Sequence, residues 1–219
     1  MTEYHKIQTV FKRNPETKHK TLLLGEYSMP ELGYLKDNKW VWTEKVDGTN
    51  IRIMFQCGIA SPRQGEIRGK TDNAQIHPQL MEIIMRKFGF GGDMKSDELF
   101  QTLEDQRDVV FYGEGYGPKI QSGGKYSQEH SFVLFDIKIG EWWLRRGDVE
   151  DIAGKHGLEV VPVVGSGTLL EMVERVKKGF KSQWGDFEAE GIVAKPTVEL
   201  RARNGERIIT KLKTKDFRA

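Results

Sequence analysis

The chain has 219 residues, 37% of them hydrophobic and 30% charged, a composition that can build a core and indicates a globular protein. It contains no run near the roughly 18 apolar residues of a membrane span, and its charged N-terminus, MTEYHKIQTVFKR, does not fit a signal peptide. We therefore expect a cytoplasmic protein that does not contact a membrane. The single cysteine, Cys57, excludes an internal disulfide framework and a cysteine-based zinc cluster.

Short strand-like runs dominate the chain, and several alternate apolar and polar residues with a period of two. In chain order they are 40–46, 50–55, 66–71, 109–112, 132–139, 158–164, 191–195 and 207–212. Helical patterns lie at 78–88, 97–106, 148–156 and 168–178. Because strands and helices do not alternate regularly, this order predicts an α+β fold with largely antiparallel sheets flanked by helices. No Pro-, Gly- or Ser-rich linker divides the chain, so we expect a single domain over residues 1–219.

The stretch TEKVDGTNIRI, residues 43–53, places a lysine just before an Asp-Gly pair. Asp47 and Gly48 between two strand-like runs predict a type I′ hairpin turn, with Lys45 and Asn50 on either side of it. The turn accounts for the aspartate and the glycine. It leaves two readings open for Lys45, an ordinary surface charge or a reactive amine.

A lysine attacks only as the neutral amine, which at the ordinary lysine pKa near 10.4 is about one part in a few thousand at neutral pH. Nearby cations favour the neutral form, whereas carboxylates favour the ammonium. A reactive Lys45 therefore needs positive charge from elsewhere in the chain. Lys211, Lys213 and a metal ion held by acidic residues are the candidates.

Several further motifs combine strands with charged residues. VVFYGEGYG runs a buried-looking strand into Glu114, and its glycine spacing does not fit the GxGxxG dinucleotide motif. SFVLFDIKI contains Phe135, and AEGIVAKP contains Glu190. Core packing or surface pairing would also explain these residues. IITKLKTK predicts Lys211, Lys213 and Lys215 on one strand face, where like charges repel unless an anion lies between them.

Basic residues gather toward the C-terminus and in one loop. Residues 195–219 hold eight Lys or Arg against three acidic residues, which suits either a phosphate partner or a solvated tail. In the segment GPKIQSGGKYSQ, we expect Lys119, Lys125 and Tyr126 to be available to phosphates and bases.

Taken together and in this order, the motifs resemble the ATP-dependent RNA ligases of the covalent nucleotidyltransferase superfamily, typified by a phage enzyme that seals nicks in double-stranded RNA. The resemblance covers about residues 20–215. The matching segments are Lys45 to Asn50 (nucleophile motif), Phe111 to Gly115 (glutamate motif), Phe132 to Ile137 (aromatic strand), Glu190 to Val193 (acidic motif) and Lys211 to Lys213 (lysine pair). KxDG also occurs in DNA ligases and mRNA capping enzymes, but those typically carry Arg in place of Asn50.

The resemblance implies the ligase adenylation fold and a lysyl-AMP intermediate. Lys45 would attack the α-phosphate of ATP, release pyrophosphate and keep AMP on its amine. Lys211 and Lys213 would hold the α-phosphate as charge builds up. The AMP would then pass to the 5′-phosphate of RNA, and a 3′-OH would displace it to form the phosphodiester.

The resemblance also implies the nucleotide pocket. Phe135 would stack on adenine, Glu114 would contact the ribose, and Glu44 and Asn50 would complete the pocket.

For the metal, the resemblance implies Glu190, with Asp47 acting through water, as the group that holds Mg²⁺ or Mn²⁺. Where relatives have Arg followed by Thr, this chain has RGKT, and we expect Arg68 and Lys70 to share that ATP-binding place.

Relatives commonly continue into a further C-terminal domain that grips RNA, whereas this sequence stops six residues after Lys213. We therefore expect a nearly bare adenylyltransferase domain, phage-encoded or bacterial. It would act on few substrates, form a homodimer or rely on a protein partner. Three alternatives stay open: a minimal DNA ligase, an enzyme that only adenylates 5′ ends, and a non-catalytic nucleic-acid-binding domain.

Overall fold

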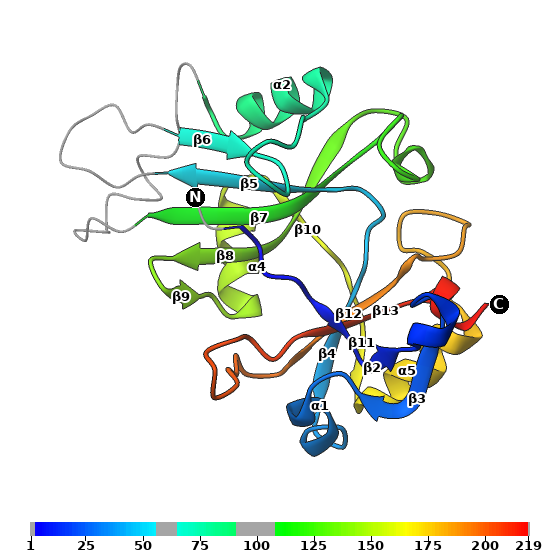
Figure 1. Ribbon diagram of the computed structural model, residues 1–219. Coiled ribbons are helices and arrows are strands. Elements are labelled where there is room, and N and C mark those ends of the chain that lie inside the picture. The colour runs from blue at the N-terminus through cyan, green and yellow to red at the C-terminus, as the bar shows by residue number, and fades with distance from the viewer. Residues whose placement is uncertain (1–2, 56–64, 91–107, 219) are drawn as a thin grey trace. The chain divides into compact units, whose positions relative to one another are not determined.

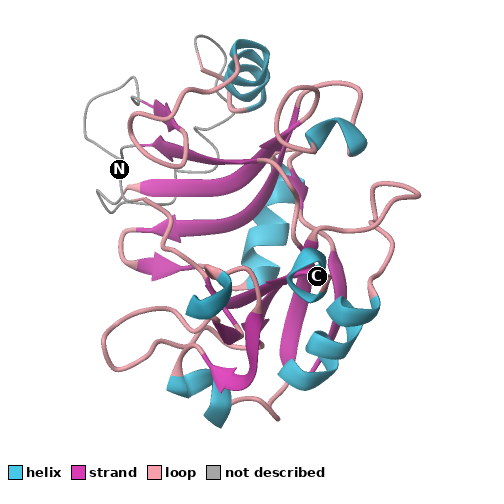
Figure 2. Ribbon diagram, turned by 45° about the vertical axis from the view of Figure 1, so that its right-hand side comes forward, coloured by secondary structure: helices cyan, strands magenta, loops and turns pink. Residues whose placement is uncertain are grey.

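The computed structural model describes residues 3–55, 65–90 and 108–218. Cys57 and the helix expected at 97–106 lie outside these residues. The chain divides into two compact units, which we call unit 1 (residues 1–4 and 47–160) and unit 2 (residues 5–46 and 161–219). Figure 1 labels most of their helices and strands, and Figure 2 colours the helices and strands of each. Each unit builds its own sheet and its own core.

Unit 1 is built on a six-stranded sheet in the order β10-β8-β7-β5-β6, with β9 paired to β8. Its pairs are antiparallel apart from the parallel β8–β10 pair. The strands are β5 (Thr49–Phe55), β6 (Gly65–Arg68), β7 (Val109–Tyr116), β8 (Ser131–Ile139), β9 (Trp142–Trp143) and β10 (Glu159–Val160). The helices are α2 (Pro78–Lys87), α4 (Arg146–Lys155) and the 3-10 turn η2 (Gly123–Lys125).

The core of unit 1 lies between one face of this sheet and the helices α2 and α4. Leu80 and Ile84 of α2 and Val149 and Ala153 of α4 are buried against apolar strand residues such as Phe111. The two-residue alternation in β5 and β7 directs these apolar side chains to one face. The opposite face is left to the polar and aromatic residues described below.

Unit 2 is built on a five-stranded sheet in the order β1-β13-β12-β4-β11, with a separate β2–β3 hairpin. The strands are β1 (Gln8–Thr9), β2 (Phe11–Arg13), β3 (Leu22–Tyr27), β4 (Trp40–Glu44), β11 (Val163–Gly167), β12 (Gly191–Pro196) and β13 (Thr210–Lys213). The helices are α1 (Pro30–Tyr34), α5 (Leu169–Lys178), and the 3-10 turns η1 (Pro15–Thr17) and η3 (Thr214–Phe217).

Helix α5 covers one face of the unit 2 sheet. It begins at a capping box, in which Thr168 Oγ1 accepts from the Glu171 N–H at 3.2 Å and Glu171 Oε2 accepts from the Thr168 N–H at 2.8 Å. Its apolar stripe, which includes Met172 and Val176, packs against Trp40 and other strand residues. This packing fixes which face of β4, β12 and β13 is buried and which is open for chemistry.

The α+β class with mostly antiparallel sheets is confirmed, as are the helices near 78–88, 148–156 and 168–178. The type I′ hairpin is wrong. Neither Asp47 nor Gly48 has the left-handed backbone that this turn needs, and β4 and β5 pair with different strands. Gly48 is required for another reason, because a Cβ there would come within 2.3 Å of the Gly115 carbonyl oxygen.

Other boundaries also differ from the prediction. The strand expected at 158–164 is two strands, β10 and β11, which belong to different sheets. Lys215 lies in η3 instead of continuing the strand face, and the strand expected from residue 207 begins at Thr210. The described helices contain none long and apolar enough to cross a membrane.

Two stacked histidines fix the start of α2 beside the start of β8. The rings of His77 and His130 lie 4.3 Å apart at an interplanar angle of 18°. Burial lowers the pKa of His130 below its usual 6.5, charge on His77 and Lys119 acts in the same direction, and a hydrogen bond to the Pro118 backbone opposes the shift. The folded protein therefore favours the neutral ring of His130.

This shift predicts a pH dependence of stability. Because the unfolded chain takes up the His130 proton more readily, the free energy of unfolding should fall as the pH drops below about 6.5. His130→Phe keeps an aromatic ring against His77 and removes this titration. We expect urea unfolding at pH 5 to 8 to show a smaller loss of stability at low pH in the variant. An unchanged difference between pH 7.5 and pH 5.5 would contradict the assignment.

Candidate active site

Lys45 lies directly after β4, beside the start of β12. Its backbone N–H donates to the Gly191 carbonyl at 2.9 Å, which extends the β4–β12 pairing by one residue. Its Nζ donates to Glu190 Oε2 at 2.6 Å. Lys45 is therefore held both by its backbone and by its side chain, and its Nζ lies at a carboxylate.

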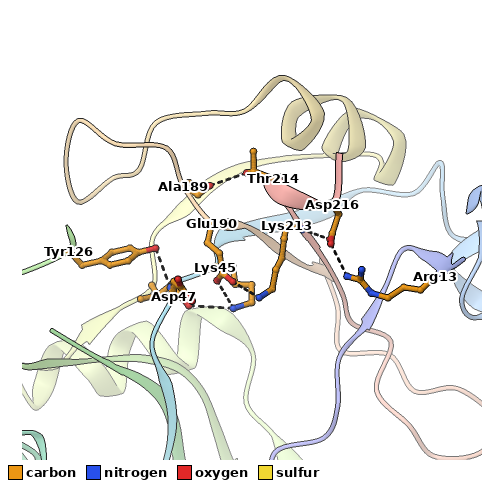
Figure 3. A network of polar contacts seen from close by, with 10 residues as sticks. Arg13, Lys45, Asp47, Tyr126, Ala189, Glu190, Lys213, Thr214 and Asp216 are labelled. Atoms are coloured by element: carbon orange, nitrogen blue, oxygen red, sulfur yellow. Dashed lines mark hydrogen bonds and ion pairs between the residues drawn. The ribbon is translucent and has the colours of Figure 1, made fainter. Parts of the chain in front are cut away.

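Glu190 binds a second lysine with its other oxygen. Lys213 Nζ lies 2.5 Å from Glu190 Oε1, so one carboxylate bridges two ammonium groups (Figure 3). The side chains of Lys45, Glu190 and Lys213 are 20%, 11% and 23% exposed. Ion pairs this shielded are screened less by salt than pairs on the surface.

The strand register places Lys211 on the same face as Lys213. In β13, Thr210 and Leu212 are fully buried, whereas Lys211 and Lys213 alternate with them and are partly exposed. Lys211 lies opposite Val193 of β12, on the face away from the α5 core. The prediction that Lys211 and Lys213 lie on one face of the strand is therefore confirmed. Lys45, at the end of β4, reaches Glu190 at the start of β12.

A close approach of two backbones makes this arrangement possible. A Cβ on Gly191 would lie 2.0 Å from the Leu212 carbonyl oxygen and 2.8 Å from Lys213 Cα. Gly191 and Lys213 are direct partners in the β12–β13 pair. Any side chain at position 191 would push apart the strands that carry Glu190 and Lys213.

Residues beyond the family motifs hold Lys213 in place. The Thr214 N–H donates to the Glu190 carbonyl at 2.8 Å, and Thr214 Oγ1 donates to the Ala189 carbonyl at 2.9 Å. Asp216 accepts from the Lys213 N–H at 2.9 Å and from Arg13 Nη2 at 2.8 Å (Figure 3). Sequence reasoning missed these contacts. The Lys-x-x-Asp spacing at a helix start was a usable signal for Asp216, but Arg13 is 203 residues away and had none.

Glu44 points to the other face of the sheet. It pairs with Ile192, a residue of the α5 core, and its side chain is buried. Its carboxylate accepts from Ser182 Oγ at 2.6 Å and from the Gln183 N–H at 2.8 Å. Burial raises the pKa of Glu44 above the usual 4.5, and these two hydrogen bonds oppose the shift. In this structure Glu44 fixes the turn at 182–183.

In unit 1, Asn50 and Glu114 face each other across β5 and β7. Asn50 Oδ1 is buried and has no hydrogen-bond partner among the described residues. Buried polar atoms without a partner are rare in native proteins, and such an atom fits a site that a ligand completes. Among the predicted nucleotide-binding residues, Asn50 therefore has an acceptor available to a donor group.

Phe135 lies on the same sheet, in an aromatic cluster. It packs with Tyr4, Tyr112 and Trp143, and its ring centre is 5.0 Å from that of Tyr4 in an edge-on arrangement. Tyr4 also donates to Asp136 Oδ2 at 2.5 Å. The ring of Phe135 is partly exposed, which stacking on a base requires.

Arg68 and Lys70 lie on a segment that a buried arginine anchors. Arg52 is fully buried and donates to the Gly69 carbonyl and to Asp72 Oδ1, both at 2.8 Å. The hydrogen bond from Arg52 lowers the pKa of Asp72. Arg68 Nε donates to Glu66 Oε1 at 2.6 Å, while Lys70 is exposed. The motif comparison did not single out Arg52, although its position in the alternating strand β5 was visible.

The loop after β7 only partly matches its prediction. Lys119 and Lys125 are exposed, as expected for phosphate contacts. The expectation for Tyr126 is wrong, because its side chain is buried and its hydroxyl accepts from the Asp47 N–H at 3.1 Å. The Ile120 side chain holds the loop on the unit 1 core.

A divalent metal would find a minimal site here. Among the described residues, no group of three or more His, Cys, Asp or Glu side chains is placed to hold a metal ion. Mg²⁺ is often held by one or two carboxylates together with substrate phosphates and water. Glu190 beside two lysines fits that mode of binding, which depends on a bound nucleotide, and does not fit a cage made of protein ligands alone.

Comparison with known proteins gives one family. A family model described as RNA ligase matches residues 38–213. An RNA ligase of Naegleria gruberi with PPi has a similar structure, with TM-score 0.62 and 16% identity over 97% of this chain and 58% of that one. Two point mutants of that ligase with ATP and Mn give TM-scores of 0.61 and 0.64 at 16% identity, over 99% and 97% of this chain and 60% and 56% of theirs. This chain thus spans less than two thirds of the Naegleria chains, and the likeness supports the shared fold.

The close backbone approach at Gly191 generates a test. Gly191→Ala should lower the free energy of unfolding by about 2 kcal/mol or more, because the new methyl group meets backbone atoms that cannot rotate away. Gly154→Ala in α4 is the control, since nothing lies within 4 Å of a Cβ there, and it should be neutral or stabilising. Chemical denaturation of both variants measures the difference. Equal stability of the two would refute the role of Gly191.

Proposed function

Because the chain belongs to the RNA ligase family, we propose that it joins RNA ends with ATP, through an AMP carried covalently on Lys45. The single observation that carries this proposal is the bridge from the Lys45 and Lys213 ammonium groups to the Glu190 carboxylate. It supplies an amine, a phosphate-binding cation and a metal-binding carboxylate within a few ångströms of one another.

In the first step, the lone pair of Lys45 Nζ attacks the α-phosphorus of ATP. A nitrogen–phosphorus bond forms, the bond to the bridging oxygen breaks, and pyrophosphate leaves. An ammonium has no lone pair, so Lys45 first loses a proton, and the amine loses another as the bond forms; both protons pass to solvent. Binding of phosphate oxygens near Lys213 and Lys211 stabilises the charge that develops.

Glu190 has two roles in this proposal. Before ATP binds, its carboxylate holds Lys45 and Lys213 close together. With ATP present, Glu190, assisted by Asp47 through water, would be the residue that holds Mg²⁺ or Mn²⁺, and the ion would supply positive charge that offsets the phosphates.

For the nucleoside, we assign Phe135 to stacking on adenine and Glu114 to the ribose. The free acceptor of Asn50 receives a hydrogen bond from the nucleotide. Arg68 and Lys70, held on the segment that Arg52 anchors, bind phosphate oxygens. Glu44 supports the site by fixing residues 182–183.

The remaining steps transfer AMP to nucleic acid. An oxygen of the RNA 5′-phosphate attacks the lysyl-AMP phosphorus and the nitrogen leaves as the amine, which takes up a proton. A 3′-OH then attacks the activated 5′-phosphate, its proton passes to solvent, and AMP departs. Lys119 and Lys125 are exposed cations available to the RNA backbone.

Self-adenylation is directly testable. Protein incubated with Mg²⁺ and ATP labelled at the α-phosphate, then denatured, should carry the label. Lys45→Ala and Lys45→Arg should both reduce it to background, because a guanidinium keeps the charge and is not a nucleophile. Lys155→Ala, in an exposed pair with Asp151, is the matched control and should label like wild type. Label on Lys45→Ala, or none on wild type, would refute the mechanism.

The choice of nucleic acid is tested with nicked duplexes that carry a 5′-phosphate and a 3′-OH. We expect an RNA nick to be sealed at least about tenfold faster than a DNA nick, the effect of one hydrogen bond to a 2′-OH. Gel analysis of the strands measures the ratio. Equal sealing of DNA would favour a minimal DNA ligase, and accumulation of adenylated 5′ ends without sealing would indicate an end-adenylating enzyme.

A further inference from the structure

The segment between β7 and β8, residues 117–130, is a compact loop that folds back on itself. Within it, the Ile120 N–H donates to the Gly117 carbonyl at 3.2 Å, the Gly123 N–H to the Ile120 carbonyl at 2.7 Å, and the Tyr126 N–H to the Gly123 carbonyl at 3.0 Å. Ile120 is buried in the unit 1 core. These contacts fix the backbone of Tyr126, so its side chain leaves the loop in a defined direction.

The Tyr126 side chain is directed inward and not toward solvent. The residue is only 8% exposed, and its ring lies 5.9 Å from that of Tyr116 at an angle of 60°. Its hydroxyl oxygen accepts from the Asp47 N–H at 3.1 Å, within the normal range for such a hydrogen bond (Figure 3). Tyr126 therefore links the loop to the KxDG motif itself.

Asp47 is two residues after Lys45, and the residues that follow it are already fixed on β7. Gly48 lies close to the Gly115 carbonyl, and Thr49 is paired with Gly115. The hydrogen bond that the Asp47 N–H donates to the Tyr126 hydroxyl adds a restraint on the Asp47 amide.

We propose that Tyr126 is a positioning residue for self-adenylation, acting through the Asp47 amide to which its hydroxyl is hydrogen-bonded. This inference rests on the proposed function. A nucleophile must approach the phosphorus in line with the leaving group, and a displacement of about 1 Å can cost about a hundredfold in rate. Tyr126 restrains the backbone that carries both Lys45 and the Asp47 carboxylate. In this role Tyr126 limits the movement of the backbone next to Lys45 and does not itself bind ATP.

The test is Tyr126→Phe, which keeps the buried ring and removes the hydroxyl. We expect the maximal rate of self-adenylation to fall about fivefold to tenfold, the effect of one lost hydrogen bond, and the ATP concentration for half that rate to change less than about twofold. Tyr116→Phe is the matched control, because it also keeps a buried ring and removes a hydroxyl that donates to Glu159 at 3.3 Å. It should adenylate like wild type.

A second measurement does not depend on activity. In protein labelled with nitrogen-15, exchange of the Asp47 amide proton with solvent deuterium should be about fivefold to tenfold faster in Tyr126→Phe than in wild type or Tyr116→Phe.

Each result decides a separate question. A Tyr126→Phe protein that adenylates at the wild-type rate, or whose Asp47 amide exchanges unchanged, overturns the positioning role. A higher ATP requirement with an unchanged maximal rate overturns it too, because it would mean that the hydroxyl binds the nucleotide. Wild-type protein without label overturns the proposed function, an outcome distinct from a labelled wild type that Tyr126→Phe matches.

Discussion

The bridge that Glu190 makes between Lys45 and Lys213 is the interaction on which the candidate active site depends. Two ammonium groups that lie at one carboxylate would repel each other if no anion lay between them. The carboxylate removes that repulsion and sets the positions of both side chains. A phosphate group carries the same sign of charge as the carboxylate, so a site organised by Glu190 in the absence of ligand already has the charge pattern that a nucleotide needs.

The strand order of unit 2 brings the three residues of this bridge together. Strands β4 and β13 both pair with β12, so Lys45 and Lys213 arrive on either side of Glu190. Helix α5 buries the opposite sheet face, which leaves the lysine face free of core packing. Gly191 leaves no room for a Cβ beside the Leu212 carbonyl, and Asp216 with Arg13 ties the end of β13 to β2. Most of these contacts are made by backbone atoms, which makes the geometry stiff.

Unit 1 holds polar and aromatic groups in positions that suit a bound nucleotide. Its sheet presents an acceptor on Asn50 without a partner among the described residues, a partly exposed ring on Phe135, and a buried Arg52 that anchors the segment of Arg68 and Lys70. Tyr126 adds a hydrogen bond to the Asp47 amide. Polar groups held ready for a ligand cost stability in the free protein, and the large apolar core on the other face of the sheet offsets that cost.

The sequence by itself determined the α+β class, three of the helices and the identity of the charged residues, because capping, periodicity and the order of motifs are local properties. The sequence also identified Lys45, Glu190 and Lys213 as a set. Only the tertiary structure decided that Asp47 and Gly48 form no hairpin turn, that residues 158–164 divide between two sheets, and that Glu44 faces the core. It also revealed Ser182 and Tyr126 as partners of Glu44 and Asp47, and Arg13 as a partner of Asp216. These contacts join residues 79 to 203 positions apart, and which pairs of distant residues meet is set by strand order and packing, which no local pattern encodes.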